Sequence, residues 1–388
     1  MYCRANIFYF CKFTKKNDTL LQFICKYAYF LLLLQKNLHF LSMALTRTYY
    51  RVAEHLFAVE SSYSELLQCM TNYEPFAVEE LLGERRKAKG EEIFTLRVEK
   101  AIGERLKARG EGWTHVLTDN AEEDMPRIEV YHSPQPYTTL NNPIPHTWLF
   151  RVAIVANAPI CCELECNEDF TEGVMRMSAD CQDVRFCIDN ALMLLFAFRT
   201  APLMTLEMHA AVVVKADRCA VGSQTATKSL LDHPYGLIDS QEKGYLFLGY
   251  SGTGKSTHAR MWLQAFPDAW LLNDDNPILR VMDDGEVRVY GSPWSGKTPC
   301  YNNAYARVGG IVKLSQAPHN KIRTISLPEA YAYMLSSASG LKMDRQMADQ
   351  MHDTIKHVVM NVKCYQLDCL PNIAAAEHCY QGMSAEPK

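Results

Sequence analysis

The stretch GYSGTGKST, residues 249–257, constrains the fold of this chain more than any other part of the sequence. Its spacing is G-x-x-x-x-G-K-[ST], in which Gly249, Gly254, Lys255 and Ser256 occupy the fixed positions of a phosphate-binding loop. Such a loop joins a buried strand to a helix. The neighbouring sequence must therefore supply a strand before the loop and a helix after it.

The residues on either side of the loop have these two patterns. Tyr245 to Leu248 is a short apolar run, typical of a buried strand. In residues 258–266 the apolar residues recur at helical spacing, which places on one helix face Ala259, Trp262, Leu263 and Phe266. The order of strand, loop and helix favours a phosphate site over a chance glycine-rich turn.

Each residue type in the loop has a chemical use. Small residues let backbone N–H groups turn inward around phosphate oxygens, and the following helix offers the positive end of its dipole. Lys255 supplies a cation to the transferred phosphate, and the Ser256 hydroxyl can ligate Mg²⁺. We therefore predict ATP and Mg²⁺ as cofactors, and the choice between ATP and GTP stays open. The predicted nucleotide-binding residues are Gly249, Ser251, Gly252, Thr253, Gly254, Lys255, Ser256 and Thr257.

The segment WLLNDDNP, residues 270–277, predicts a strand that ends in two carboxylates, Asp274 and Asp275. Asp274 follows Lys255 by only 19 residues, so the chain makes one helix and returns beside the loop. Phosphoryl transfer to a hydroxyl needs a metal clamp and a base. Adjacent side chains on a strand point to opposite sides, which predicts different roles for the two aspartates. A surface Asp-Asp turn is the alternative interpretation.

SGTGKST followed closely by LLNDDN resembles the kinase fold shared by HPr kinase/phosphorylase and ATP-dependent phosphoenolpyruvate carboxykinase. The nearest likeness is to uncharacterised HPr-kinase-like proteins of bacteria. The resemblance covers about residues 205–388. The sequence lacks the signature loop with which HPr kinases engage their protein substrate, and it lacks a recognisable oxaloacetate and manganese site.

The resemblance implies a role for each matching residue. His209, in MHAAVVV, is expected on the strand before the phosphate loop, and Lys255 is expected to hold the nucleotide; both are expected to be catalytic residues. Asp274 is implied to be the catalytic base. Asp275 is implied to bind the metal together with Ser256.

A second glycine-containing loop, GSPWSGKTPCYNN, spans residues 291–303 and carries Lys297. It could close over the γ-phosphate or the acceptor, with Lys297 as a catalytic residue that stabilises charge in the transition state. A purely structural turn is the alternative. The acceptor itself stays open, and we expect a hydroxyl on a protein, a peptide or a small metabolite. Two other functions stay open as well, a carboxykinase-like enzyme and a non-catalytic, ATP-binding regulatory module.

The predicted fold class is α/β, of mixed α+β type, in two domains. Residues 204–388 are expected to form a P-loop kinase domain of the HPr kinase/phosphoenolpyruvate carboxykinase type, and residues 43–203 a β-rich N-terminal domain. Strands are predicted there over residues 93–99, 127–131 and 148–154. The run IDNALMLLFAF, residues 188–198, is apolar nearly all round and predicts a helix buried between the domains.

Residues 1–42 differ in composition from the rest of the chain. They carry a net charge of +5, which leaves −9 for the remainder because the whole chain carries −4. Their longest apolar run, Tyr27 to Leu34, is too short to cross a bilayer, which needs about 20 residues. Three interpretations stay open: a true start at Met43, a leader or membrane-surface anchor, and a structured extension.

Composition narrows the class of protein. With 48% apolar and 22% charged residues the chain has the balance of a soluble globular protein, and its charge gives no basic footprint for nucleic acid. The fourteen cysteines contain no CxxC pair, which predicts reduced thiols in the cytoplasm and no zinc site. We expect no stable membrane span, and a homo-oligomer stays open. The basic segments 83–91 and 103–111 favour solvated surface over a phosphate site.

Overall fold

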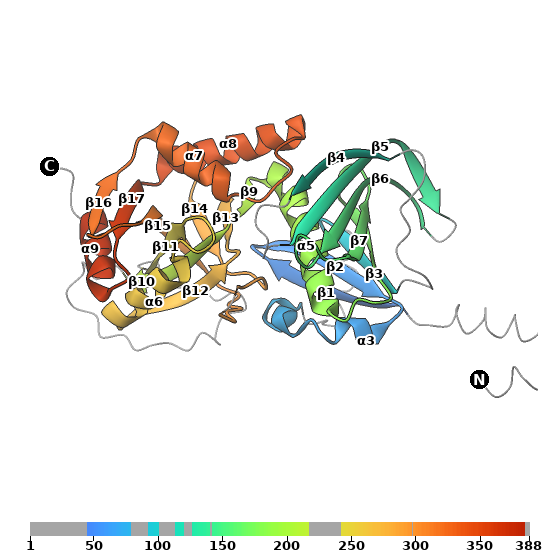
Figure 1. Ribbon diagram of the computed structural model, residues 1–388, viewed down its shortest axis with the longest axis horizontal. Coiled ribbons are helices and arrows are strands. Elements are labelled where there is room, and N and C mark those ends of the chain that lie inside the picture. Colours follow the sequence, from blue (N-terminus) through green and yellow to red (C-terminus); the bar gives the residue numbers. More distant parts are fainter. Residues whose placement is uncertain are drawn as a thin grey trace, which may run out of the picture. The chain divides into compact units, whose positions relative to one another are not determined.

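The structure is a computed structural model that describes residues 45–78, 92–100, 113–119, 126–139, 142–216, 242–296 and 298–384. The chain divides into two compact units, Met1–Thr46 and Arg47–Lys388. The second unit contains two sheets with their helices, so the protein has the mixed α/β class expected from the sequence (Figure 1). The extension 1–42 and the basic segments 83–91 and 103–111 lie outside the described residues.

The first sheet has eight strands in the described part, in the order β1-β2-β3-β8-β7-β6-β5-β4. Its strands are β1 (Thr46–Val52), β2 (His55–Ser61), β3 (Thr95–Lys100), β4 (Thr114–Asp119), β5 (Arg127–Thr139), β6 (Asn142–Ala153), β7 (Ile160–Cys166) and β8 (Glu172–Met177). The strands predicted over 93–99, 127–131 and 148–154 are confirmed as β3, β5 and β6. Strand β2 is buried on both faces, because Leu56 and Ala58 join one apolar cluster while Phe57 and Val59 join another.

The helix predicted over residues 188–198 is confirmed as α5 (Val184–Thr200). The Asp183 side chain accepts a hydrogen bond from the Phe186 N–H (2.9 Å) and so caps the helix. Helix α5 packs against β3 and β8 of the first sheet and against β9 (Thr205–Glu207). The window Val184–Leu203 is long and apolar enough to span a membrane, but 56% of it is buried, as in a core helix. Two short elements of the same unit are α3 (Ser64–Leu67) and η1 (Thr71–Phe76).

The second sheet has nine strands among the described residues, in the order β12-β10-β11-β15-β14-β13-β9, with β17 beside β15 and β16 beside β17. The remaining strands are β10 (Ala210–Ala216), β11 (Glu242–Leu248), β12 (Ala269–Asp275), β13 (Ile278–Val281), β14 (Val287–Tyr290), β15 (Tyr305–Gln316), β16 (Lys321–Thr324) and β17 (Cys364–Cys369). Strand β15 runs parallel to β11 and β17, whereas β10 is antiparallel to β11 and β12. The strands predicted at residues 245–248 and before the aspartate pair, from residue 270, are confirmed as β11 and β12.

Helices cover both faces of the second sheet (Figure 1). They are α6 (Lys255–Ala265) and α9 (Ile373–Ser384) on one face, and α7 (Leu327–Ser337) and α8 (Arg345–Asn361) on the other. Strand β10 contributes apolar side chains to both faces of the sheet. Ala211 and Val213 join the cluster of Trp262, and Val212 and Val214 join the cluster on the opposite face. Burial of each such apolar side chain stabilises the fold by about 1.5–3 kcal/mol, less for alanine.

A helix over residues 344–360 is also predicted, with a core stripe that begins at Met343. The helix is confirmed as α8, and Met347 and Met351 are buried. Met343 is 63% exposed, so its assignment to the core is wrong. The reason is that Asp344 is the N-cap and accepts from the Met347 N–H (2.8 Å), which leaves Met343 before the first turn.

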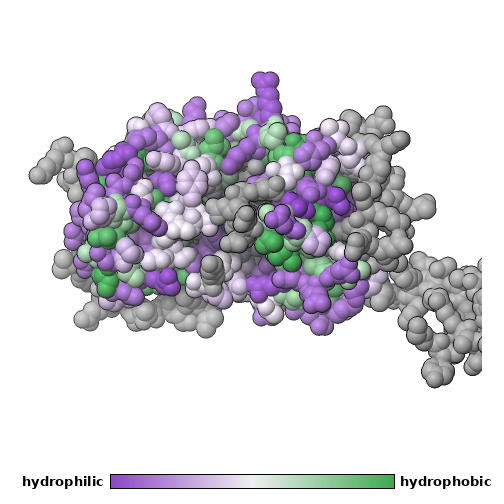
Figure 2. Space-filling view, viewed as in Figure 1, coloured by the Kyte–Doolittle hydropathy of each residue, from purple (hydrophilic) through white to green (hydrophobic). Residues whose placement is uncertain are grey.

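The surface of the described part is mixed in character. On the face shown in Figure 2, hydrophilic residues predominate and smaller hydrophobic areas lie between them. Among the large apolar residues that are exposed, Tyr250 stands out at 70%. It belongs to the loop of residues 249–257, so an exposed aromatic ring lies beside the predicted phosphate site.

Candidate functional site

The loop of residues 249–257 connects the end of β11 to the start of α6, as the sequence predicts. Gly252 and Gly254 have φ angles of 73° and 105°, which residues with a Cβ rarely adopt. Gly254 is the N-cap of α6, and the Thr253 N–H donates to the Tyr250 carbonyl (3.2 Å). The glycines thus make the turn that points the start of α6 toward the loop.

The side chain of Lys255 is held within the loop. It is 8% exposed, and its Nζ donates to the carbonyl oxygens of Gly249 (2.9 Å) and Tyr250 (3.4 Å). The same Nζ lies 3.1 Å from Nε2 of His209. The ammonium group therefore has a fixed position at the centre of the loop, set by the backbone that surrounds it.

Both aspartates lie at the edge of the sheet where the loop begins. Strand β12 is antiparallel to β10, so that Ala211 faces Asp274 and Ala210 faces Asp275. On its other side Ala210 faces Leu248, the last residue of β11. The strand ends that carry the aspartates and the loop are therefore separated by one strand. Asp274 is 4% exposed and the Asp275 side chain is 36% exposed, so the two carboxylates have different environments.

His209 joins the lysine to one of these aspartates. Its Nε2 lies 3.2 Å from Oδ1 of Asp275, as well as 3.1 Å from Nζ of Lys255. A single ring nitrogen either accepts from Lys255 or donates to Asp275, so the tautomer of His209 decides which bond forms. The sequence places His209 on a strand. It lies instead one residue before β10, where its N–H donates to the Ser337 carbonyl (2.7 Å).

Asp275 has an unusual backbone conformation. Its φ is 152°, which a residue with a side chain seldom adopts. It forms an isolated β-bridge with Ser295 of the second glycine-containing loop. The surrounding contacts thus hold Asp275 in a strained geometry, a feature that concentrates at functional sites.

The second glycine-containing loop runs against the aspartate pair. The Gly296 N–H donates to the Asp274 carbonyl (2.7 Å). A Cβ at Gly296 would lie 3.1 Å from that carbonyl oxygen, a tight contact, so glycine favours this close approach. Lys297, the catalytic candidate in this loop, lies outside the described residues, and its role stays a prediction.

Asn273 is a positioning residue that the sequence analysis missed. It is fully buried, and its Nδ2 donates to Ser292 Oγ (3.2 Å) and to the Trp294 carbonyl (3.0 Å). Its Oδ1 accepts from the Asn276 N–H (2.9 Å). Asn273 therefore fixes both the turn after the aspartate pair and the start of the second loop. Its position directly before Asp274 is the sequence signal that could have identified Asn273.

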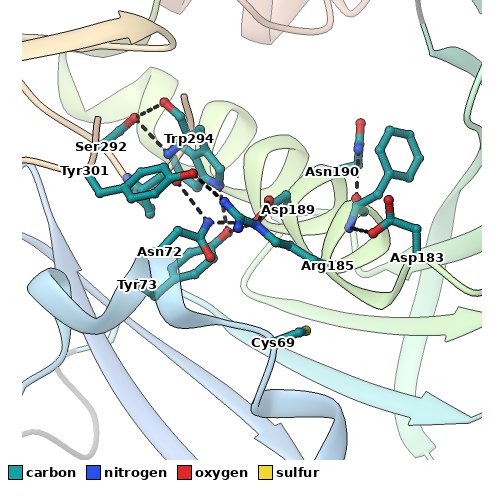
Figure 3. A network of polar contacts seen from close by, with 12 residues as sticks. Cys69, Asn72, Tyr73, Asp183, Arg185, Asp189, Asn190, Ser292, Trp294 and Tyr301 are labelled. Carbon is teal, nitrogen blue, oxygen red and sulfur yellow. Dashed lines mark hydrogen bonds and ion pairs between the residues drawn. The ribbon is translucent and has the colours of Figure 1, made fainter. Parts of the chain in front are cut away.

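A polar network continues from the second loop to α5 and η1 (Figure 3). The Trp294 Nε1–H donates to the Tyr73 hydroxyl (2.8 Å), and this hydroxyl donates to Asp189 Oδ1 (2.7 Å). Arg185 donates to Asp189 Oδ2 (3.4 Å) and to the Tyr301 hydroxyl (2.6 Å). Burial raises the pKa of both Tyr73 and Asp189. The network thereby joins η1 and α5 to the loop that contacts the aspartates.

Tyr73→Phe is expected to lower the free energy of unfolding by about 1–3 kcal/mol, because it leaves the buried Trp294 N–H without its acceptor. Urea unfolding of both proteins measures this difference. Tyr63→Phe serves as the control, since that ring lies under Lys100 rather than in the network. Equal losses of stability in the two variants would contradict the role given to the Tyr73 hydroxyl.

Three further residues near the loop or the aspartate pair were missed. Lys313 of β15 faces Leu248, and its Nζ lies 5.1 Å from the ring centroid of Tyr250. Gln316 Nε2 donates to the Gly252 carbonyl (3.2 Å) and so supports the loop. Burial lowers the pKa of Lys313. These contacts depend on strand β15 running beside β11, which no local sequence pattern specifies.

Glu207 is the third of these residues. It lies on β9, is 1% exposed, and its Oε2 has no hydrogen-bond partner among the residues that the structure describes. Burial, together with the nearby Asp275 carboxylate, raises the pKa of Glu207 to about 8. A lone glutamate in the apolar run before His209 was the signal that could have identified it.

This raised pKa makes stability depend on pH. The folded state keeps the Glu207 proton up to about pH 8, whereas the unfolded chain loses it near its ordinary pKa of about 4.5. Stability is therefore expected to fall as pH rises between these values, by at most about 1.4 kcal/mol per pH unit. Glu207→Gln is expected to remove this slope in urea titrations with EDTA present. Glu168→Gln, on an exposed side chain, is the control, and an unchanged slope in Glu207→Gln would refute the assignment.

No protein-family model matches this sequence, and no curated protein shows significant similarity to it.

Proposed function

We propose that this protein is an ATP- and Mg²⁺-dependent phosphotransferase that moves the γ-phosphate of ATP to a hydroxyl acceptor on a protein, a peptide or a small metabolite. One observation carries the proposal. His209 lies within hydrogen-bond distance of both Lys255 and Asp275. These residues lie at one edge of a sheet, next to Asp274 and to a loop with phosphate-binding spacing. A chance glycine turn would not require this convergence.

The residues divide the work according to their chemistry. Backbone N–H groups of the loop and the Lys255 ammonium would bind the phosphates, and the start of α6 adds its dipole. Ser256 is exposed in the first turn of α6, and with the Asp275 carboxylate it offers the hard oxygen donors that Mg²⁺ prefers. Bound there, Mg²⁺ would neutralise charge on the phosphate oxygens. Asp274 would take the proton of the acceptor hydroxyl.

We extend the proposal to the type of the C-terminal domain and to the location of the protein in the cell. Residues 204–388 would form a kinase domain of the HPr kinase/phosphoenolpyruvate carboxykinase type, and the protein would act in the cytoplasm. The first sheet would recognise the acceptor or a partner. The network from Tyr73 to Trp294 supports this role of the first sheet, because it reaches the loop that contacts the aspartates.

The test is transfer of label from γ-labelled ATP in a cell extract to which the purified protein is added. Wild-type protein is expected to label a discrete acceptor, and the Asp274→Asn variant is expected not to. Decarboxylation of oxaloacetate by the pure protein would instead identify a carboxykinase-like enzyme. Nucleotide binding with no labelled product and no decarboxylation would identify a regulatory module.

A further inference from the structure

Four cysteines come together at the start of α5, in a different part of the molecule from the phosphate loop. The Sγ atoms of Cys161, Cys162 and Cys187 all lie within 4.8 Å of one another, and all three residues are buried. The Sγ of Cys181 lies 3.5 Å from that of Cys187. In a tetrahedral site with Zn–S bonds of about 2.3 Å, neighbouring sulfurs are about 3.8 Å apart. The three buried thiols are close to this spacing, whereas Cys181 contacts Cys187 but lies outside the 4.8 Å group and would move inward as the fourth ligand.

A β-bulge brings the two adjacent cysteines to the same side. Along β7, Cys162 faces Val152 of β6, but Ile160 faces Ala153, so Cys161 is an extra residue in the ladder. On a regular strand, neighbouring side chains point to opposite faces. A bulge redirects a side chain, and here it allows both thiols to reach the cluster.

The other two thiols are fixed by backbone hydrogen bonds. The Ser178 N–H donates to the Cys161 carbonyl (2.7 Å), and the Cys181 N–H donates to the Ser178 carbonyl (3.1 Å). This turn therefore places Cys181 next to the bulge. Cys187 lies in the first turn of α5, where the Cys187 N–H donates to the Asp183 carbonyl (3.3 Å). The start of a helix favours the negative charge of thiolates.

We infer that Cys161, Cys162, Cys181 and Cys187 form a binding site for one Zn²⁺ ion. Four thiolates in a closed tetrahedral arrangement are a ligand set typical of structural zinc. Binding displaces the thiol protons to solvent, including the proton that Cys161 shares with the Val152 carbonyl (3.0 Å). Cys181 is half-buried, so the ion has a route to the cluster from solvent.

The site has a structural consequence for α5. Cys187 lies on the same helix as Arg185 and Asp189, which hold the network of Figure 3. Zinc would fix the start of this helix to strand β7 and to the turn before α5. The sequence predicted no zinc site because cysteines close to one another in the chain lack ligand spacing, whereas the bulge and the turn combine cysteines up to 26 residues apart.

The test uses the full-length protein, purified with a reductant and without added metal. Elemental analysis is expected to find about one zinc per chain, or cobalt added to stripped protein is expected to give sulfur-to-cobalt charge-transfer absorption. Cys181→Ser is expected to weaken metal affinity at least about tenfold, because it removes one ligand. Cys369→Ser changes another half-buried cysteine outside the cluster and is expected to bind as wild type.

Three results would overturn the inference. They are the absence of zinc or a cobalt band in reduced, folded wild-type protein; equal metal affinity in the Cys181→Ser and Cys369→Ser variants; and a disulfide between two of the four cysteines in protein purified with a reductant. Melting temperature with and without a chelator gives an independent reading. It is expected to fall on chelation in wild type and in Cys369→Ser, and not in Cys181→Ser.

Discussion

Asp274→Asn is expected to reduce phosphoryl transfer by about 10²- to 10⁴-fold, the usual contribution of a general base, while nucleotide affinity changes little. The substitution keeps the size of the side chain and replaces the carboxylate with a neutral amide, which cannot take the proton. Asp274 is 4% exposed and lies against the second glycine-containing loop, so the shape of the site should survive. The rate of label transfer and the affinity for ATP are measured on the same preparation.

Asp275→Asn is the matched control for this prediction, because it makes the same chemical change one residue away. It is expected to raise the Mg²⁺ concentration needed for activity, since a neutral amide is a poorer ligand for a hard cation. If Asp275→Asn instead lowers the transfer rate and Asp274→Asn raises the Mg²⁺ requirement, Asp275 is the base and Asp274 binds the metal. Wild-type turnover and metal dependence in both would leave the proposed enzyme without a base.

Lys255→Ala is expected to abolish turnover and to weaken ATP binding at least about tenfold. A hydrogen bond to a charged group contributes about 1.5–3 kcal/mol, and the Lys255 ammonium is fixed at the centre of the loop by Gly249 and His209. The readouts are turnover and the rise in melting temperature caused by ATP with Mg²⁺. Arg260→Ala removes an exposed positive charge from the same helix and is expected to behave as wild type. Unchanged turnover and affinity in Lys255→Ala would refute the phosphate-loop assignment.

The loop and the aspartate pair were predictable because their signals are local. Strand, glycine turn and helix are consecutive in the sequence, and the short distance from Lys255 to Asp274 limits how far the chain can travel. The structure confirms the elements on which this argument depends, β11, α6 and β12. The pairing of β10 between β11 and β12 then brings the two local signals together.

The parts that could not be predicted depend on pairing between distant strands. Gln316 and Lys313 reach the loop because β15 lies beside β11. The cysteine cluster depends on a bulge, which one extra residue in the register produces without any pattern in the sequence. His209 was misplaced by one residue because the strand that follows it begins only at Ala210, after the backbone has bonded to Ser337.

Calorimetric titration of the full chain with ATP and Mg²⁺ measures whether residues 249–257 bind the phosphates of a nucleoside triphosphate. The expected result is one ATP per chain, with binding that requires the phosphates and is therefore absent for adenosine. Lys255→Ala is expected to bind ATP more weakly, which would show that the heat measured in wild type comes from binding at the loop. Failure of the folded wild-type protein to bind ATP at millimolar concentration, or equal binding of adenosine and ATP, would contradict phosphate binding by this loop.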